Sequence, residues 1–413
     1  MRPDLLVEAS PFSAIDEVAI SRPSALPTLV RARCSSVTAF RLPRPGPRWA
    51  GRAPAVSGAA VDLDARRATI RAAGEFWERY AASFAFADRR GLTRTRLEGR
   101  SVGLEEILAG DRCRGYAYEL PDPEAEGDWV RGVDLLRGEP TWLPAEAVFH
   151  PYVDRDGQVE PHWAWTSNGL AAGATPARAA EAALLEVVER DAFMRHWLSR
   201  RPGRPIGERR WRSLLPPPLL EAVDACRPWR LRLALLASDG LPVVIAVAAL
   251  VHRDRAPALT LAAACRFELD AAVRAAVLEV LHSRSVSDRL SAARPLEPAP
   301  SEPRDFEDRA RLYGRPERLS SAIWLLGDDG AGAGEPGQAG TLRGLLRALD
   351  QQGLRAYAAD LTTRDAAAAG FAVARVLVPG SQLLEADHRA QIVNRSRLRL
   401  EAGEANPEPH PFP

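Results

Sequence analysis

Apolar residues recur every three or four positions in four stretches of the chain, as they do on the buried face of an α-helix. The spacing predicts helices at about residues 62–86, 175–198, 269–290 and 341–352. The second stretch opens on Thr175 and Pro176, a pair typical of a helix N-terminus. The fourth is followed by Gly353, and glycine commonly ends a helix.

Short runs of branched and small apolar residues alternate with these helices. They predict strands at residues 231–237, 242–251, 322–326 and 372–378, and therefore a mixed α/β fold. Stretches rich in Pro, Glu, Gly and Asp predict exposed loops at 291–318 and 327–340. We expect a lead-in of strands and loops over residues 1–60, a mixed α/β domain over 61–400 and a Pro-rich tail over 401–413.

The composition is that of a globular protein without a strong overall charge. The 413 residues are 46% apolar and include 55 basic against 54 acidic residues, a net charge of +1. So weak a field does not favour nucleic acid or an anionic membrane as a partner. The chain has no secretory signal pattern and no run of about 18 apolar residues, so we expect a cytoplasmic protein. Every basic residue is Arg, so a phosphate site would use guanidinium groups.

The same charged motif, Glu-x-x-Glu-Arg, occurs in two of the predicted helices. Its copies are Glu75, Glu78 and Arg79 in the first helix, and Glu186, Glu189 and Arg190 in the second. Positions i, i+3 and i+4 share one helical face, so each helix presents two carboxylates and one guanidinium together. Phe, Trp and Val neighbours indicate that both helices are largely buried, where unpaired carboxylates are costly.

Two interpretations of the duplicated motif are open at this point. Each Glu can pair with its own Arg on a solvated helix face, which is the usual role of a single motif of this kind. If the two helices instead face each other, four carboxylates and two Arg converge. Oxygen ligands suit Mg²⁺ and guanidinium groups suit phosphates, so that arrangement would form a metal–nucleotide pocket.

Four segments resemble the YcaO family, in the order in which that family has them. Residues 167–193 open Ser-Asn-Gly-Leu-Ala-Ala-Gly-Ala-Thr-Pro and close Leu-Leu-Glu-Val-Val-Glu-Arg-Asp-Ala-Phe. The others are Ala-Ala-Gly-Glu-Phe-Trp-Glu-Arg-Tyr near residue 75, Ala-Asp-Leu-Thr-Thr at 359–363 and Val-Ala-Arg-Val-Leu-Val-Pro-Gly at 373–380. The resemblance spans residues 58–413 and implies a YcaO-type mixed α/β fold that binds ATP without a common Gly-rich phosphate loop.

The resemblance also implies which residues bind the cofactors ATP and Mg²⁺. By it, the carboxylates of four residues are magnesium or nucleotide ligands, namely Glu75, Glu78, Glu186 and Glu189. Arg79 and Arg190 would contact phosphates or hold these carboxylates. A further helix of the family's site matches Ala-Val-Leu-Glu-Val-Leu-His-Ser-Arg, which makes Glu279, His282 and Arg284 weaker candidates, with core or surface roles as the alternative.

The sequence ends in Pro407-Glu-Pro-His-Pro-Phe-Pro413, whose alternate prolines favour a stiff polyproline II conformation. A generic tail of this kind can be disordered or bind an SH3-like domain. The resemblance implies instead the azoline-forming branch of the YcaO family, in which such a tail enters the active site. That branch uses ATP to convert Cys, Ser or Thr of a ribosomal precursor peptide into thiazolines or oxazolines. His410 and the terminal carboxylate of Pro413 are candidate proton acceptors.

Four positions depart from the family pattern, because polar ligands are common where this chain has Arg71, Ala171, Ala174 and Arg178. Two other hypotheses therefore stand beside the cyclodehydratase. One is a catalytically degenerate YcaO-like subunit that acts as a scaffold in a peptide-modifying complex. The other is a YcaO thioamidation enzyme.

The expected partners follow from the same resemblance. The substrate would be a precursor peptide, and a separate leader-peptide-binding or activating-enzyme-like protein is implied because no segment here resembles such a module. Oxidation of azolines to azoles would need a separate flavin dehydrogenase. A homodimer is one possible assembly.

Overall fold

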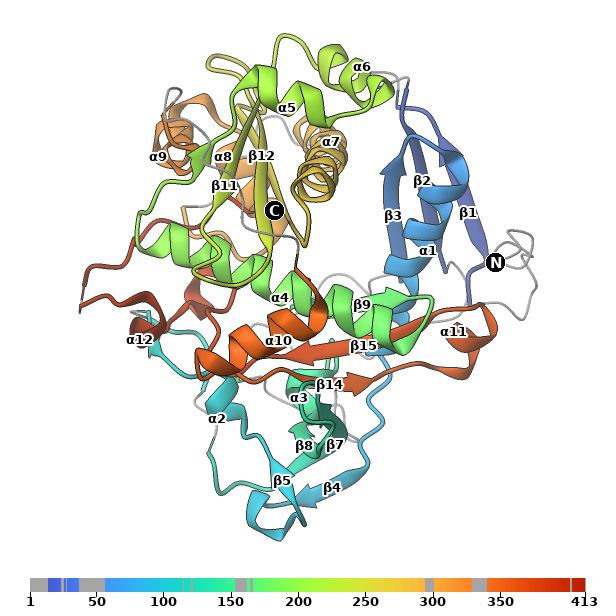
Figure 1. Cartoon of the computed structure of the whole chain (residues 1–413), viewed down its shortest axis with the longest axis vertical. Coiled ribbons are helices and arrows are strands. Elements are labelled where there is room, and N and C mark those ends of the chain that lie inside the picture. The colour runs from blue at the N-terminus through green and yellow to red at the C-terminus, as the bar shows by residue number, and fades with distance from the viewer. Residues whose placement is uncertain are drawn as a thin grey trace.

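The computed structural model describes residues 14–412, apart from 24–25, 27, 37–55, 114, 120–121, 153–161, 164–165, 294–300, 329–339 and 402. Three larger sheets and one long helix, α4 (Pro176–Leu198), organise this part of the chain. Helix α4 crosses the middle of the molecule, with one sheet below it and another above it (Figure 1). The fold is mixed α/β, as the sequence predicted.

The N-terminal sheet has three antiparallel strands, β1 (Glu17–Ser21), β2 (Val30–Ser35) and β3 (Ser57–Asp62). Helix α1 (Ala65–Ala82) follows β3 and packs back onto β2 and β3. Gly58 permits this close contact, because a Cβ there would lie 2.2 Å from the Ala72 carbonyl oxygen of α1. The domain boundary predicted at residue 60 falls inside β3.

The seven-stranded sheet collects strands from distant parts of the sequence. Its order is β5-β8-β7-β14-β15-β9, and β4 pairs with β7 beside that path. The strands are β4 (Arg89–Leu92), β5 (Arg100–Ser101), β7 (Gly127–Asp134), β8 (Pro140–Pro144), β9 (Leu170–Gly173), β14 (Tyr357–Asp360) and β15 (Ala372–Leu377). Short helices accompany it, α2 (Leu104–Ile107), α3 (Ala145–Val148) and α11 (Arg364–Ala368). A separate strand pair joins β6 (Asp111–Arg112) to β16 (Ile392–Val393).

The four-stranded sheet is antiparallel in the order β10-β11-β12-β13. Its strands are β10 (Arg204–Pro205), β11 (Arg230–Leu236), β12 (Val244–Val251) and β13 (Leu259–Arg266). Both faces are buried: Val247 packs in the cluster formed with α4, and Ala248 packs in the cluster formed with α7 (Leu269–Ala293). Alternate residues of a strand point to opposite faces, so a sheet covered on both sides has nearly continuous apolar strands.

Helix α7 connects this sheet to the N-terminal sheet, because it contacts β12, β13 and β3. In Figure 1 it lies between β12 and β3. The remaining helices are α5 (Glu208–Leu214), α6 (Pro217–Ala225), α8 (Phe306–Tyr313), α9 (Ser320–Ile323), α10 (Leu342–Gln351) and α12 (Arg395–Leu398).

The four predicted helices are confirmed as α1, α4, α7 and α10, and Gly353 follows α10 with a φ of +76°. Three predicted strands are confirmed as β11, β12 and β15. The strand predicted at 322–326 was wrong: α9 and a 3₁₀ turn (Trp324–Leu326) occupy it. A short apolar run fits a buried helical turn as well as a strand, and Leu325 and Leu326 are buried beside α4.

The loop predicted at 291–318 was also partly wrong, because α8 lies inside it. Asp305 caps this helix by accepting a hydrogen bond from the Asp308 N–H. Arg309 and Tyr313, one turn apart on α8, are both buried. The sequence of this helix does not show an apolar face, because its buried side chains are an Arg and a Tyr as well as Leu312.

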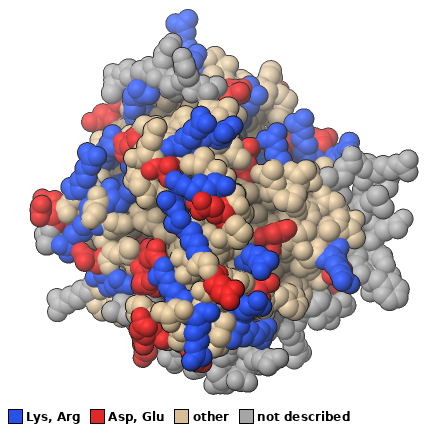
Figure 2. Space-filling view, turned by 60° about the horizontal axis from the view of Figure 1, so that its bottom comes forward, with Lys and Arg blue, Asp and Glu red and all other residues tan. Residues whose placement is uncertain are grey.

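The surface has mixed charge on the face drawn in Figure 2, where Arg side chains are interspersed with Asp and Glu. Neither sign dominates that face, in agreement with the net charge of +1. Within the described residues, no helix is both long enough and apolar enough to cross a membrane.

Candidate functional site

The first Glu-x-x-Glu-Arg motif lies where α1 meets β3. The Glu75 carboxylate accepts a hydrogen bond from the Ala59 N–H at 2.6 Å and pairs with Arg79, one turn further along the helix. Arg79 also donates to the Ser57 carbonyl at 2.6 Å. These bonds fix the first carboxylate and the guanidinium of the motif against the edge of the N-terminal sheet.

Glu78, the second carboxylate of this motif, faces β9. It accepts a hydrogen bond from the Ala172 N–H at 2.9 Å. Loss of hydration raises the pKa of Glu78 well above its usual range, and the carboxylates of Glu186 and Glu75 raise it further. The charges of Glu75 and Glu186 therefore act on the buried carboxyl of Glu78, and a cation bound beside it would offset them.

The second motif lies on α4, which Thr175 caps by accepting a hydrogen bond from the Arg178 N–H. Glu186 accepts a hydrogen bond from the Gly169 N–H at 3.0 Å and pairs with Arg190 at 3.2 Å. Glu189 is buried and accepts a hydrogen bond from the Cys265 N–H of β13 at 2.9 Å. Burial raises the pKa of Glu189 to about 7, against the opposing charge of Arg190.

One short backbone segment links the two motifs. Glu78 of α1 binds the N–H of Ala172 in β9, and Glu186 of α4 binds the N–H of Gly169, just before β9. Gly169 has a φ of +78°, and a Cβ there would lie 2.4 Å from the Val376 carbonyl oxygen. The structure therefore brings the two predicted motifs together around a segment that requires glycine.

Helix α7 adds His282 to this cluster. Burial lowers the pKa of His282, and the carboxylates of Glu279 and Glu75 oppose that shift. Glu279 itself is exposed. Arg284 has its contacts elsewhere: it pairs with Asp288 at 2.8 Å, and its guanidinium carbon lies 3.6 Å from the Trp229 ring centroid. The structure does not bring Arg284 to the carboxylates, because it follows Glu279 by five positions and points to a different side of the helix.

The described residues contain no group of three or more Asp, Glu, His or Cys side chains close enough to hold a metal ion alone. All four motif carboxylates accept a backbone N–H, and those of Glu75, Glu186 and Glu189 also pair with an Arg. This fits Mg²⁺, which proteins usually bind through one or two carboxylates together with substrate phosphates. It does not suit a metal enclosed entirely by protein ligands.

The four departures from the family pattern lie around this cluster. Arg71 pairs with Asp62 at 3.3 Å, and Arg178 pairs with Glu181 at 2.8 Å. Ala171 is buried within β9, and Ala174 is exposed. Both departing Arg therefore have acidic partners outside the two motifs.

The C-terminal tail, described over residues 403–412, runs backwards along α4 towards the second motif. Successive tail residues contact successively earlier residues of the helix: Asn406 with Leu198, Glu408 with Trp197, His410 with Phe193, and Phe412 with Arg190. The guanidinium carbon of Arg190 lies 4.0 Å from the Phe412 ring centroid. Pro413, one of the two predicted proton acceptors, lies outside the described residues.

His410, the other predicted proton acceptor, is fully buried. Its Nε2 donates to the Glu385 carbonyl at 2.9 Å, while its own carbonyl accepts a hydrogen bond from Arg309 at 3.0 Å. Burial and the charge of Arg309 lower the pKa of His410 well below its usual range. The imidazole is therefore neutral, and its Nδ1 has no hydrogen-bond partner among the described residues.

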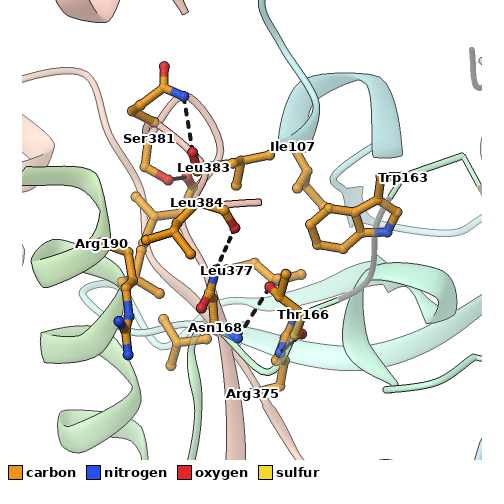
Figure 3. A pocket seen from close by; sticks show the side chains of 14 residues that line it. Ile107, Trp163, Thr166, Asn168, Arg190, Arg375, Leu377, Ser381, Leu383 and Leu384 are labelled. Atoms are coloured by element: carbon orange, nitrogen blue, oxygen red, sulfur yellow. Dashed lines mark hydrogen bonds between the residues drawn. The ribbon is translucent and has the colours of Figure 1, made fainter. Parts of the chain in front are cut away.

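A small pocket lies between Arg190 on one side and Trp163 on the other (Figure 3). Its walls are mostly apolar and include Ile107, Val187, Leu377, Leu383 and Leu384. Asn168 is fixed there by donating to the Leu384 carbonyl at 2.8 Å. Arg375 also lines the pocket and is 1% exposed, and burial lowers its pKa to about 10 although the charge of Glu186 opposes this.

Sequence reasoning did not select Asn168 or Arg375, although both stand in segments that resemble the family. Arg375 donates to the carbonyls of Ala147 and Thr166 at 3.2 and 3.0 Å, so it also holds the pocket wall together. A lone Arg within an apolar strand was the available signal, because burying an unpaired charge in a strand is costly.

Comparison with known proteins assigns most of the chain to one family. A family model described as YcaO cyclodehydratase, ATP- and Mg²⁺-binding, matches residues 62–382. This agrees with the predicted cofactors, ATP and Mg²⁺, and with the four segments that carried the resemblance.

Solved structures with the same fold include three that cover most of this chain. YcaO from Methanopyrus kandleri, bound with AMPPCP and Mg²⁺, is 22% identical, covers 92% of this chain and 89% of its own, and has a TM-score of 0.62. A heterocyclase in complex with substrate and cofactor is 18% identical and covers 98% of this chain and 56% of its own, with a TM-score of 0.73. The Escherichia coli microcin synthetase McbBCD complex is 13% identical, with coverages of 98% and 99% and a TM-score of 0.67. At sequence identities of 13–22%, the structural similarity shows that this chain shares the fold of these proteins.

Proposed function

The chain belongs to the YcaO family, and from that premise we propose that it is an ATP-dependent peptide cyclodehydratase that forms azolines. Its substrates would be Cys, Ser or Thr residues of a ribosomal precursor peptide, converted to thiazolines or oxazolines. The observation that carries the proposal is the meeting of both motifs around β9, with the tail docked along α4 as far as Arg190.

Four carboxylates would hold Mg²⁺ and the nucleotide, those of Glu75, Glu78, Glu186 and Glu189. Arg79 and Arg190 would contact phosphates, and exposed Glu279 and half-buried His282 would border the site from α7. When bound, MgATP would supply the phosphoryl group that turns an amide oxygen into a phosphate leaving group. The chain's own contribution is to fix these charges before the ligand arrives, since backbone N–H groups already orient every motif carboxylate.

On the peptide, the side-chain sulfur or oxygen bonds to the preceding carbonyl carbon, and the carbonyl oxygen is lost as the C=N bond forms. The nucleophile and the amide nitrogen each give up a proton, so the peptide loses one water per ring. A base must accept these protons. We propose His410 and the carboxylate of Pro413 for this task. The unpartnered Nδ1 is the atom of His410 that would accept a proton, and burial beside Arg309 makes it a weak base until the bound ligand changes these surroundings.

The scaffold alternative rests on Arg71, Ala171, Ala174 and Arg178. The pairing of Arg71 with Asp62 and of Arg178 with Glu181 argues against it, because neither guanidinium is needed by the motif carboxylates. Titration calorimetry with ATP and Mg²⁺ distinguishes the two. An active enzyme should bind ATP in a magnesium-dependent manner, whereas a scaffold should not. A thioamidation enzyme has no separate observation in its favour.

The decisive experiment is mass spectrometry of a candidate precursor peptide after incubation with the protein, ATP, Mg²⁺ and a leader-peptide-binding partner. We expect loss of one water per ring and formation of ADP and phosphate. The substitution Glu186→Gln should abolish both the loss of water from the peptide and the formation of ADP and phosphate. Loss of water without ATP consumption, or exchange of oxygen for sulfur, would contradict the proposal. Oxidation to azoles would require a separate flavin dehydrogenase, and size-exclusion chromatography of the protein with its partner would show whether it is a homodimer.

A further inference from the structure

Three successive carbonyls of the tail accept hydrogen bonds from three side chains. The Trp197 indole N–H donates to the Glu408 carbonyl at 2.9 Å, the Tyr313 hydroxyl to the Pro409 carbonyl, and Arg309 to the His410 carbonyl at 3.0 Å. Proline has no N–H, so a tail with alternate prolines cannot pair as a strand on both edges. Three of its carbonyls accept side-chain donors instead, and α8 supplies two of the three.

Arg309 is the centre of this arrangement. It is 0% exposed, and besides His410 it donates to the Ala386 and Glu385 carbonyls, each at 3.2 Å. Its guanidinium also lies 3.4 Å from the Glu385 carboxylate. A buried guanidinium that donates to three backbone carbonyls and pairs with a carboxylate is held in one geometry, so α8, the segment after β15 and the tail are fixed together.

We propose that Arg309, Tyr313 and Glu385 form a clamp that positions the tail and, through Phe412, sets the orientation of Arg190. The Phe412 ring is buried between Phe193, at 4.8 Å between centroids, and the guanidinium of Arg190. Arg190 in turn pairs with Glu186 and borders the pocket of Figure 3. The clamp residues are positioning residues: they touch the tail and leave the motif carboxylates to other side chains.

Hydrogen exchange of the tail tests the clamp without any assumption about the reaction. Tyr313→Phe keeps the ring against Trp197 and removes one donor, so we expect exchange of the tail amides to rise about fivefold, as for the loss of one hydrogen bond. Arg309→Met removes every donor and should raise it by tenfold or more. The α4 amides should keep their protection in Tyr313→Phe.

The matched control is Arg195→Met. Arg195 is likewise buried and ion-paired, with Asp191 at 2.9 Å and with Asp239, and none of its described contacts is a tail residue. Its loss should leave tail exchange unchanged. Unchanged tail exchange in both clamp variants would overturn the proposal, and so would an equal rise in Arg195→Met. Should Arg309→Met fail to fold, Tyr313→Phe still decides the question.

The catalytic part of the inference rests on the proposed function and is tested separately. Arg309→Met should lower the rate of ring formation by at least tenfold in the full chain, the scale of one lost charged hydrogen-bond network. Because a chain without residues 406–413 lacks both proposed proton acceptors, the second readout is magnesium-dependent ATP affinity, which Arg309→Met should lower in the full chain without causing a further loss in the truncated one. A loss of equal size in both backgrounds would mean that Arg309 only supports the fold. Absence of rings with the unsubstituted protein would refute the proposed function, while the exchange measurement would still report on the clamp.

Discussion

Single carboxylates in this site are held in surroundings that disfavour their charge. Burial is the largest cause of the raised pKa at both Glu78 and Glu189, and neighbouring carboxylates add to it. Each keeps a backbone N–H as partner, which partly offsets the shift. Such groups reduce stability when they ionise without a cation, so the pH dependence of folding reports on the site.

Glu189 gives the first prediction, because its pKa is about 7 in the folded protein against an ordinary value of 4.5. The folded state retains the proton that the unfolded state loses, so this group lowers stability as the pH rises from 4.5 to 7. Glu189→Gln should therefore gain stability relative to the unsubstituted protein over that window, by at most roughly 3 kcal/mol. Denaturant unfolding without Mg²⁺ at several pH values measures the difference.

The comparison must be made between the two proteins, because buried histidines act in the opposite direction. Burial lowers the pKa of His150 to about 3 and of His196 to about 4, so these groups increase stability as the pH rises through their unfolded pKa. They contribute equally to both proteins and cancel in the difference. If the difference in unfolding free energy between Glu189→Gln and the unsubstituted protein does not change with pH, Glu189 is already ionised at pH 5.

Glu78 gives a prediction for ligand binding. Glu78→Gln keeps the shape and can still accept the Ala172 N–H, but it removes a charge that Glu186 and Glu75 oppose. We expect magnesium-dependent ATP affinity to fall by about tenfold or more, as for the loss of one charged metal ligand, with unfolding stability unchanged or higher. Calorimetry and thermal unfolding measure the two effects. Glu181→Gln, which removes the partner of Arg178 on α4, is the control and should leave ATP affinity unchanged.

The residue-level predictions from sequence succeeded where helical geometry alone determines the outcome. The spacing of i, i+3 and i+4 placed Glu75 with Arg79 and Glu186 with Arg190, and both pairs form. Arg284 was grouped with them from its nearness in sequence, yet its side chain contacts Trp229 and Asp288. Which side of a helix faces a distant element depends on tertiary packing, which periodicity does not specify.

At the scale of elements, long amphipathic helices were predictable and short charged ones were not. Helices α1, α4 and α7 show apolar periodicity over at least four turns, which fixes both their type and their buried face. Helix α8 has only eight residues, and its buried side chains include Arg309 and Tyr313. Their burial is explained by the tail that covers them, a contact between positions about a hundred residues apart.

The contact between α1 and β3 gives the third prediction. A Cβ at position 58 would lie 2.2 Å from the Ala72 carbonyl oxygen and 2.4 Å from the Phe76 nitrogen, both backbone atoms that cannot move alone. Gly58→Ala should lower the free energy of unfolding by more than about 3 kcal/mol. It should also weaken MgATP binding, because Glu75 is oriented by the neighbouring Ala59 N–H.

Denaturant unfolding measures this cost, and Gly207→Ala provides the control. Position 207 is open, with nothing within 4 Å of a Cβ, so its substitution should cost less than about 1 kcal/mol. Equal effects at the two glycines would show that β3 and α1 are packed less closely than 2.2 Å implies.

At the scale of the whole molecule, the site lies where three hydrophobic clusters meet. One cluster contains most of α4, a second contains α1 and a third contains α7. Glu78 joins α1 to β9, Glu189 joins α4 to β13, and α7 brings His282 beside Glu75. A ligand bound to these carboxylates would therefore be shared by elements from all three clusters.

This sharing gives the last prediction, which concerns ligand removal. A non-hydrolysable ATP analogue with Mg²⁺ at a hundred times its dissociation constant should stabilise the folded protein by about 2.7 kcal/mol. Because the ligand would contact elements of all three clusters, the unfolding transition should shift upwards as a whole and not split. Chelation of Mg²⁺ by EDTA should remove most of the shift, since the carboxylates then lose the cation that offsets their charge. The double variant Glu78→Gln, Glu186→Gln should respond weakly to the analogue with or without EDTA. A shift of equal size in EDTA, or in the double variant, would place the nucleotide somewhere other than between α1 and α4.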